Sequence, residues 1–207
     1  MSYRAGLDGR DRSHTGKLGP VQTLTPCGPP MVFPAVASGA NGDGIVAWID
    51  TKTSAVEVRR VSPTGKPGPV ITVTPKNYQA YSVSVAMSPA GLALVTWDGE
   101  PNAARFIGTN NALSKVIGLG GGAVTAPAVV FSKSGAATVA WTEDGFAEAV
   151  ASRVTPKGLG TVKVIAGQAA GTVYGVPAIA DDSNGDTYLL TTVKATSGRK
   201  TIYHLDR

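Results

Sequence analysis

The stretch Gly42-Asp43-Gly44-Ile45-Val46-Ala47-Trp48 decides the fold, because its Gly-x-x-x-Val-x-Trp pattern returns further along the chain. Full copies of the pattern occupy residues 91–97 and 135–141. A degenerate copy occupies residues 185–191, where threonine replaces tryptophan. Each full copy ends in a tryptophan, and the chain contains only these three. Successive tryptophans are 49 and 44 residues apart. A period of this length is typical of one supersecondary unit used several times.

Short strands are predicted on both sides of each copy. An apolar segment precedes each glycine, as at Pro34–Ala37. After each tryptophan, a polar turn leads to a third segment such as Val56–Val61, and a Gly/Pro turn leads to a fourth such as Val70–Thr74. Segments of this length, rich in Val, Thr and Ile and bounded by Gly, Pro, Asn and Asp, indicate strands and turns. No segment has a sustained 3.6-residue apolar period, so we expect essentially no helix.

Both ends of the chain fall inside a unit. Residues 16–26 nearly duplicate residues 65–75, so residues 1–26 are expected to supply a third and a fourth strand, at Ser2–Leu7 and Val21–Thr25. Residues 201–205 are predicted to be a third strand as well. We expect the ring of units to close at four, with Val21–Thr25 as the outer strand of the last sheet. The alternative is an open ring that a second copy completes, because open ends expose sheet edges.

Four strands in 40–50 residues is the spacing of propeller blades. The pattern resembles the β-propeller repeats of many secreted bacterial proteins, over residues 1–207. This resemblance implies an all-β fold: a single domain forming a small β-propeller of about four four-stranded antiparallel blades, either whole or part of a larger propeller. The WD40 pattern is missing, and the sialidase Asp-box is only approached near residues 185–188. The expected units lie near residues 34–81, 82–126, 127–176 and 177–207, with half a blade at 1–26.

Composition and charge narrow the class of partner. Charged residues make up 16% of the chain, and the net charge is +5. The basic residues are scattered rather than grouped in a run, which argues against nucleic acid as a partner. No apolar run is long enough for a membrane helix. Residues 1–20 lack the apolar core of a signal peptide, which leaves an intracellular protein or the mature part of a secreted one. We expect the second, outside the cell or at its surface.

Few residues offer the chemistry of a cofactor or a nucleophile. Cys27 is the only cysteine, and His14 and His204 are the only histidines. A disulfide within the chain is therefore impossible, and neither a multi-cysteine metal site nor a Cys–His pair in a known motif is present. We expect no cofactor.

One acidic loop resembles the start of a calcium-binding loop. Asp182, Asn184 and Asp186 place oxygen atoms at alternate positions, as the first ligands of such a loop do. The glycine and the glutamate that an EF-hand needs further on are replaced by Thr187 and Val193. Two interpretations stay open: a looser Ca²⁺ site at these three residues, or a solvated hairpin turn.

Acidic residues also follow each tryptophan, and they bear on catalysis. Asp50, Asp98, Glu143 and Asp144 are predicted to lie on one rim of the propeller, at the ends of the second strands. Hydrolysis of a glycoside needs two facing carboxylates. No motif in this sequence marks two of its acidic residues as such a pair.

The tryptophans are expected to be core residues, because they alternate with core valines. The alternative is a set of exposed sugar platforms.

These observations favour a non-catalytic extracellular binding or scaffold module whose ligand is a glycan or another protein. The alternative is a carbohydrate-active enzyme of sialidase-like architecture. A monomer and a ring-completing homo-oligomer are both compatible with the sequence.

Overall fold

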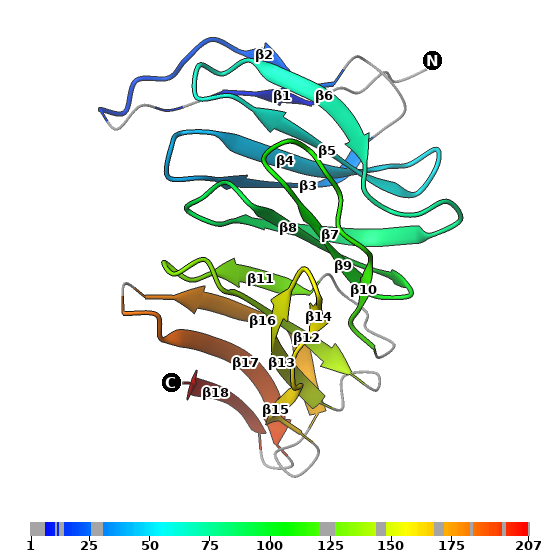
Figure 1. Cartoon of the computed structure of the whole chain (residues 1–207). Helices are drawn as coiled ribbons and strands as arrows, with labels where there is room; N and C mark the ends of the chain where they lie inside the picture. The colour runs from blue at the N-terminus through cyan, green and yellow to red at the C-terminus, as the bar shows by residue number, and fades with distance from the viewer. Residues whose placement is uncertain are drawn as a thin grey trace.

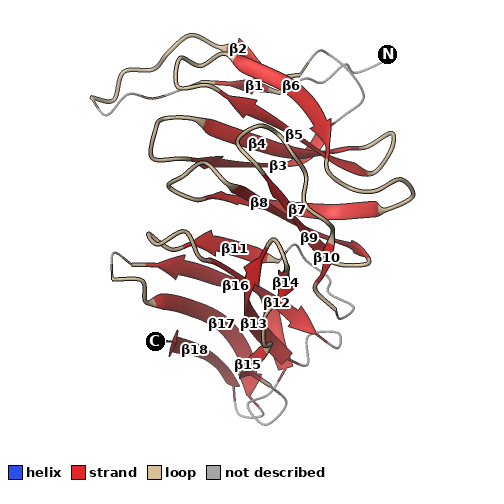
Figure 2. Cartoon of the chain, viewed as in Figure 1, coloured by secondary structure: helices blue, strands red, loops and turns tan. Residues whose placement is uncertain are grey.

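The computed structural model describes residues 7–10, 12, 15–25, 31–120, 127–143, 148–167, 172–182, 184–195 and 198–206. All regular secondary structure in these ranges is β-strand, as predicted (Figure 2). No helix of the described part is long and apolar enough to cross a membrane. Cys27, His14, Asp144 and most of the predicted strand Ser2–Leu7 lie outside the described residues.

The strands form antiparallel sheets in chain order, which we call the half-blade and blades 1 to 4 (Figure 1). The half-blade contains β1 (Asp8–Gly9) and β2 (Gln22–Thr23). Blade 1 contains β3 (Met31–Ser38), β4 (Gly44–Asp50), β5 (Ala55–Val61) and β6 (Pro67–Thr72). Blade 2 contains β7 (Gln79–Met87), β8 (Ala93–Glu100), β9 (Ala103–Ile107) and β10 (Ile117–Gly118).

The last two blades follow the same order. Blade 3 contains β11 (Ala128–Phe131), β12 (Ala137–Glu143), β13 (Glu148–Thr155), β14 (Gly158–Leu159) and β15 (Lys163–Ala166), where β14 and β15 both pair with β13. Blade 4 contains β16 (Thr172–Asp181), β17 (Thr187–Ala195) and β18 (Gly198–Asp206). Each blade therefore begins with the predicted pair of strands around its Gly-x-x-x-Val-x-Trp segment.

The first strands of the blades lie at the centre. β3 packs against β7, and β11 packs against both β7 and β16. The turns that follow these four strands meet around one axis, where residues of all four blades line a single cavity of about 360 Å³. This arrangement is that of a small β-propeller of antiparallel blades, four-stranded in blades 1 and 2, which confirms the predicted fold class.

The turns between the first and second strands explain the glycine of the pattern. Gly42, Gly91, Gly135 and Gly185 all have φ between 79° and 89°. The N–H of Gly91 donates to the carbonyl oxygen of Ser88 at 2.9 Å, and the other three turns have the corresponding bond. This is a type I turn followed by a left-handed residue, which favours glycine. The predicted hairpin turns are confirmed.

The tryptophans are core residues. Trp48 is 1% exposed, and Trp97 and Trp141 are 0% exposed. Trp97 belongs to a cluster that includes Ile49 and Val58 of blade 1, so it joins its own blade to the preceding one. Trp141 joins blade 3 to blade 2 in the same way. The alternative interpretation as sugar platforms is wrong, because a platform needs an exposed ring face.

Two arginines also connect neighbouring blades, and sequence analysis missed them. Arg105 of blade 2 donates to the carbonyl oxygens of Ser114 in its own blade and of Val73 in blade 1, both at 2.7 Å. Arg59 of blade 1 donates to Gly68 in its own blade and to Leu24 in the half-blade. Both side chains therefore hold the outer strand of the preceding blade by its main chain.

The half-blade repeats the outer half of blade 1 in detail. Leu7 accepts a bond from the N–H of Leu24 at 2.7 Å and donates its own N–H to the hydroxyl of Thr25 at 2.9 Å. In blade 1, Val56 makes the same two bonds with Val73 and Thr74, at 2.8 and 3.2 Å. β1 and β2 are therefore the third and fourth strands of a unit. β2 lies within the predicted strand Val21–Thr25, whereas β1 begins one residue after the predicted strand Ser2–Leu7.

The ring is not closed in the predicted way. β2 pairs with β1, and β18 pairs with β17; no pairing joins the half-blade to blade 4 among the described residues. Figure 1 shows β1 and β2 at one end of the row of sheets and β18 at the other. The half-blade packs on blade 1 instead, where Arg59 holds Leu24. The expectation that Val21–Thr25 serves as the outer strand of the last sheet is therefore wrong.

Candidate functional site: a crevice beside the half-blade

A cavity of about 750 Å³ lies between the half-blade and blade 1. We call it the crevice. Seven consecutive residues of β3 and its turn, 34–40, line one wall, so the crevice follows the strand. At about 3.3 Å per residue in a strand, this wall is roughly 20 Å long. The shape is that of a trough for an extended ligand.

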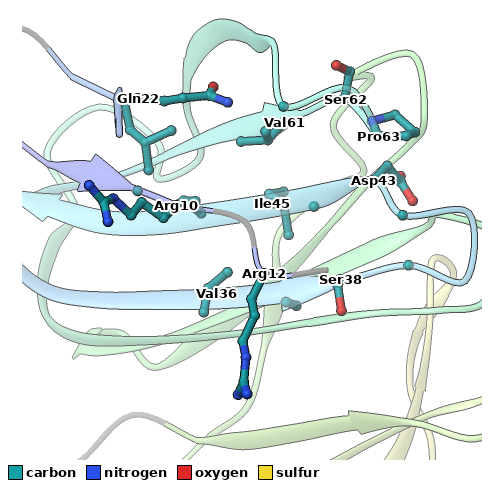
Figure 3. Close-up of a pocket in the computed structure, with 18 of the residues that line it drawn as sticks. Arg10, Arg12, Gln22, Val36, Ser38, Asp43, Ile45, Val61, Ser62 and Pro63 are labelled. Atoms are coloured by element: carbon teal, nitrogen blue, oxygen red, sulfur yellow. The ribbon is translucent and has the colours of Figure 1, made fainter. Parts of the chain in front are cut away.

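The crevice combines an apolar floor with polar ends. Figure 3 shows Val36 and Ile45 on neighbouring strands, with Arg10 and Gln22 of the half-blade on one side and Asp43 at the far end. Val36 is 74% exposed, an unusual position for a valine on the innermost strand of a blade. None of the described residues that line the crevice is aromatic.

The far end of the crevice carries a charge pair. Nη1 of Arg60 lies 3.7 Å from Oδ2 of Asp43, and Nη2 donates to the carbonyl oxygens of Gly91, Ile107 and Gly108 at 2.9–3.0 Å. Burial lowers the pKa of Arg60, and Asp43 opposes this effect. The ion pair with Arg60 holds the side chain of Asp43 in place at this end of the crevice.

Among the described residues the half-blade contains two strands, and the crevice lies on the inner side of β1. In blades 1 and 2 the third strand pairs on its inner side with a second strand, as Val46 pairs with Arg59. β1 occupies the third position but pairs only with β2 among the described residues. No other described strand pairs with its inner edge, and Asp8, Gly9 and Arg10 line the crevice. Unpaired strand edges bind extended peptides by main-chain hydrogen bonds.

A second cavity, of about 660 Å³, lies on the opposite rim between blades 1 and 2. It is lined by side chains that can bond sugar hydroxyls, among them Glu57, Asn77, Tyr78 and Gln79. Burial raises the pKa of Glu57, repulsion from Asp50 adds to this, and a hydrogen bond from Nε1 of Trp48 at 3.0 Å opposes it. A carboxyl group with a raised pKa is a feature of general acids.

The raised pKa of Glu57 predicts a pH-dependent effect of the Glu57→Gln substitution. The folded state disfavours the ionised carboxylate, so the wild type loses stability as pH rises through the pKa of Glu57 in the folded protein. We expect Glu57→Gln to stabilise the protein at pH 7 by less than about 1 kcal/mol, because the group is partly solvated. Well below the ordinary pKa of 4.5, the two proteins should be equally stable. Urea unfolding at about pH 3 and at pH 7 measures this; an advantage that grows at low pH would contradict it.

The acidic loop at the axis forms a hairpin turn. Oδ1 of Asp182 accepts the main-chain N–H groups of Asn184 at 2.8 Å and Asp186 at 3.0 Å. These bonds lower the pKa of Asp182, the bond from Asp186 most of all. No group of three His, Cys, Asp or Glu residues in the described part of the chain is placed to hold a metal ion. A Ca²⁺ site at Asp182, Asn184 and Asp186 stays a prediction.

The other predicted acids have separate structural roles. Oδ1 of Asp50 caps its own turn by accepting the N–H of Lys52 at 2.7 Å. Asp98 is 4% exposed, and burial raises its pKa. Glu143 accepts the indole N–H of Trp141 at 3.0 Å. Nothing in these contacts brings two of the acids together as a facing pair.

Comparisons with known proteins relate the fold to that of solved propellers. No protein-family model matches the chain, and no curated protein sequence is similar to it. A protein of unknown function from Bacteroides caccae is similar in structure, with a TM-score of 0.54 and 14% identity over 93% of this chain and 66% of that one. An exo-β-1,3-galactanase from Phanerochaete chrysosporium, solved with galactose, has a TM-score of 0.52 and 12% identity over 97% of this chain and 53% of that one.

An endo-arabinase from Bacteroides thetaiotaomicron has a TM-score of 0.50 and 8% identity over 84% of this chain and 74% of that one. The chain thus spans about half to three quarters of the length of these structures. At such identities the likeness describes the fold alone. The β-propeller architecture is shared, and the chemistry of the crevice has to be argued from its own residues.

Proposed function

We propose that the protein is a non-catalytic, extracellular binding module that holds an extended polypeptide segment in the crevice. The observation that carries this proposal is the inner edge of β1, with which no other described strand pairs, beside an apolar trough. The edge offers main-chain donors and acceptors, while Val36 and its partly buried strand partner Val46 offer apolar contact. This combination suits a strand that alternates its side chains between the two walls.

A polypeptide suits the crevice better than a glycan for a chemical reason. Sugar sites use an exposed aromatic face as a platform, and no aromatic residue lines the described walls of this crevice. The extracellular location rests on the resemblance of the sequence pattern to that of secreted bacterial proteins.

The crevice can be tested with a charged substitution at its floor. The change is Val36→Glu, which should not disturb folding because Val36 is 74% exposed. We expect the wild type to bind a subset of extended peptides on a peptide array and the variant to lose that binding by about ten-fold or more, since a buried unpaired carboxylate opposes apolar contact. Val70→Glu, at an exposed valine on β6, is the matched control. Equal loss in both variants, or no peptide bound by the wild type, would contradict the proposal.

A second candidate function is action on carbohydrate, and the second cavity favours it. Glu57 and Tyr78 line that cavity, and the chain has exposed aromatic rings at Phe33 and Tyr81 as well. The hydroxyl of Tyr81 lies 3.4 Å from Oε1 of Gln79, which also lines the cavity. The structural neighbours include a galactanase and an arabinase. A glycan array and a panel of chromogenic glycosides separate the functions: turnover that is lost in Glu57→Gln supports the enzyme, and glycan binding without turnover supports a lectin.

A further inference from the structure

A cavity of about 300 Å³ lies between blades 3 and 4, apart from the crevice. It adjoins the small apolar cluster through which the two blades meet, since Ala151 and Leu189 belong to both. Two buried hydroxyl groups line it: Thr138 is 6% exposed and Thr187 is 3% exposed. Oγ1 of each is buried without a hydrogen-bond partner. A buried polar group without a partner is unfavourable, so both hydroxyls favour an occupant that accepts hydrogen bonds.

Two cations line the same cavity. Arg153 of β13 lies opposite Thr138 in the strand register, and Lys163 of β15 lies opposite Ala151. Residues 151 and 153 share a face of β13, so both cations lie on the face of blade 3 that is turned toward blade 4. None of the described residues that line the cavity is acidic. An occupant with negative charge therefore suits it better than water.

The junction between blades 2 and 3 shows how these positions are filled in an ordinary interface. Four of its residues are buried in one apolar cluster: Leu94, Phe106, Ile117 and Ala137. By strand pairing and repeat spacing they are equivalent, in this order, to Thr138, Arg153, Lys163 and Thr187. Four apolar core positions are thus replaced by two hydroxyls and two cations around a cavity. Packing of the blades does not require this change.

Arg153 also lacks the ion pair that its counterpart in blade 1 has. Arg60 occupies the same register position, opposite Ile45, and pairs with Asp43. Asp43 lies five residues before the tryptophan of its blade, and the residue at that position in blade 3 is Ala136. The acid that balances Arg60 is therefore replaced by an alanine near Arg153.

We infer that this cavity binds a tetrahedral oxyanion, phosphate or sulfate, either free or as the ester of a small molecule. Thr138 and Thr187 would donate to its oxygen atoms from opposite blades, and the two cations would balance its charge. Donors on both sides suit an anion whose acceptors point in several directions. At roughly 30 Å³ per water, the cavity has room for about ten waters, which is enough for an esterified group as well. This site is independent of the proposed function of the crevice.

A titration of the full chain tests the site, with amide shifts followed by NMR at pH 7. The probes are inorganic phosphate and glucose 6-phosphate, and sodium chloride at equal ionic strength is the reference. We expect saturable shifts around residues 138, 153 and 187 with at least one phosphate probe, and none with chloride. The probe that binds more tightly shows whether the free ion or the ester is preferred. No saturable shift with either probe, or the same shifts with chloride, would overturn the inference.

Two variants with matched controls locate the binding. Thr138→Val removes a hydroxyl at constant volume, and Arg153→Met removes a cation; each should weaken phosphate binding by about ten-fold or more. Thr142→Val is the control for the first, because its hydroxyl is also buried without a partner on β12 but lies outside the cavity. Lys157→Met, at an exposed cation outside the cavity, is the control for the second.

Both controls should bind phosphate as the wild type does. Phosphate should raise the melting temperature of the wild type and the controls more than that of the two site variants, because a ligand stabilises only the state that binds it. Melting without phosphate confirms that each variant folds. Wild-type affinity in Thr138→Val and Arg153→Met, or an equal loss in the controls, would overturn the inference.

Discussion

Replacing Trp97 with alanine is expected to lower the free energy of unfolding by about 3–5 kcal/mol. The indole is 0% exposed and shares a buried cluster with Ile49 and Val58 of blade 1, so its removal leaves a cavity between two blades. Urea denaturation followed by circular dichroism measures the change. A loss under about 1 kcal/mol would show that blade 2 does not depend on this contact.

The matched control for this prediction is Trp97→Phe. Nε1 of Trp97 is buried without a hydrogen-bond partner in the structure, so phenylalanine should lose packing volume but no hydrogen bond. Trp48→Phe differs, because it removes the donor that faces Glu57. We therefore expect Trp48→Phe to cost more than Trp97→Phe, by about 1 kcal/mol, the net value of one hydrogen bond. The reverse order would mean that packing differences outweigh the Trp48–Glu57 bond.

The fold could be predicted from the sequence because its strongest constraints are local. A glycine with positive φ is required in each first turn, and the buried tryptophan lies six residues later on the next strand. Both positions are fixed by strand and turn geometry, which sequence spacing records. The fourth strand of the half-blade, β2, was predictable for the same reason, since residues 16–26 nearly duplicate residues 65–75.

The crevice and the path of the ring could not be predicted in this way. Counting strands gives the number of blades but not how far they turn around the axis, so the predicted pairing of Val21–Thr25 with the last sheet was wrong. The crevice lies where no described strand pairs with the inner edge of β1, and no residue pattern in the sequence marks such an edge. Its wall residues, such as Val36 and Gln22, resemble ordinary strand residues in the sequence.

The connecting arginines were hidden by a difference in turn length. Arg59 follows Trp48 by eleven residues, whereas Arg105 follows Trp97 by eight, so a fixed spacing does not reveal them. Only the strand register, in which Arg59 pairs with Val46 and Arg105 with Val95, shows that they are equivalent.

Replacing Arg105 with methionine is expected to lower the free energy of unfolding by about 2–4 kcal/mol, because two carbonyl oxygens lose a charged donor. Methionine keeps much of the apolar length of the side chain but removes both donors. The carbonyl oxygens of Ser114 and Val73 then lose charge-assisted bonds of 2.7 Å, and a hydrogen bond to a charged group is worth about 1.5–3 kcal/mol. Burial lowers the pKa of Arg105. Desolvation of the guanidinium therefore offsets part of the stability that its two hydrogen bonds contribute.

The consequence should reach beyond blade 2, because Val73 belongs to the outer end of blade 1. Amide exchange should therefore quicken at residues 72–74 as well as around Ser114 in Arg105→Met. Lys115→Met, an exposed cation next to Ser114, is the matched control and should change neither stability nor exchange by a measurable amount. Faster exchange confined to blade 2 would show that the bond to Val73 does not hold the two blades together. Faster exchange in both blades would identify the arginine as the connection that packing of Trp97 alone does not supply.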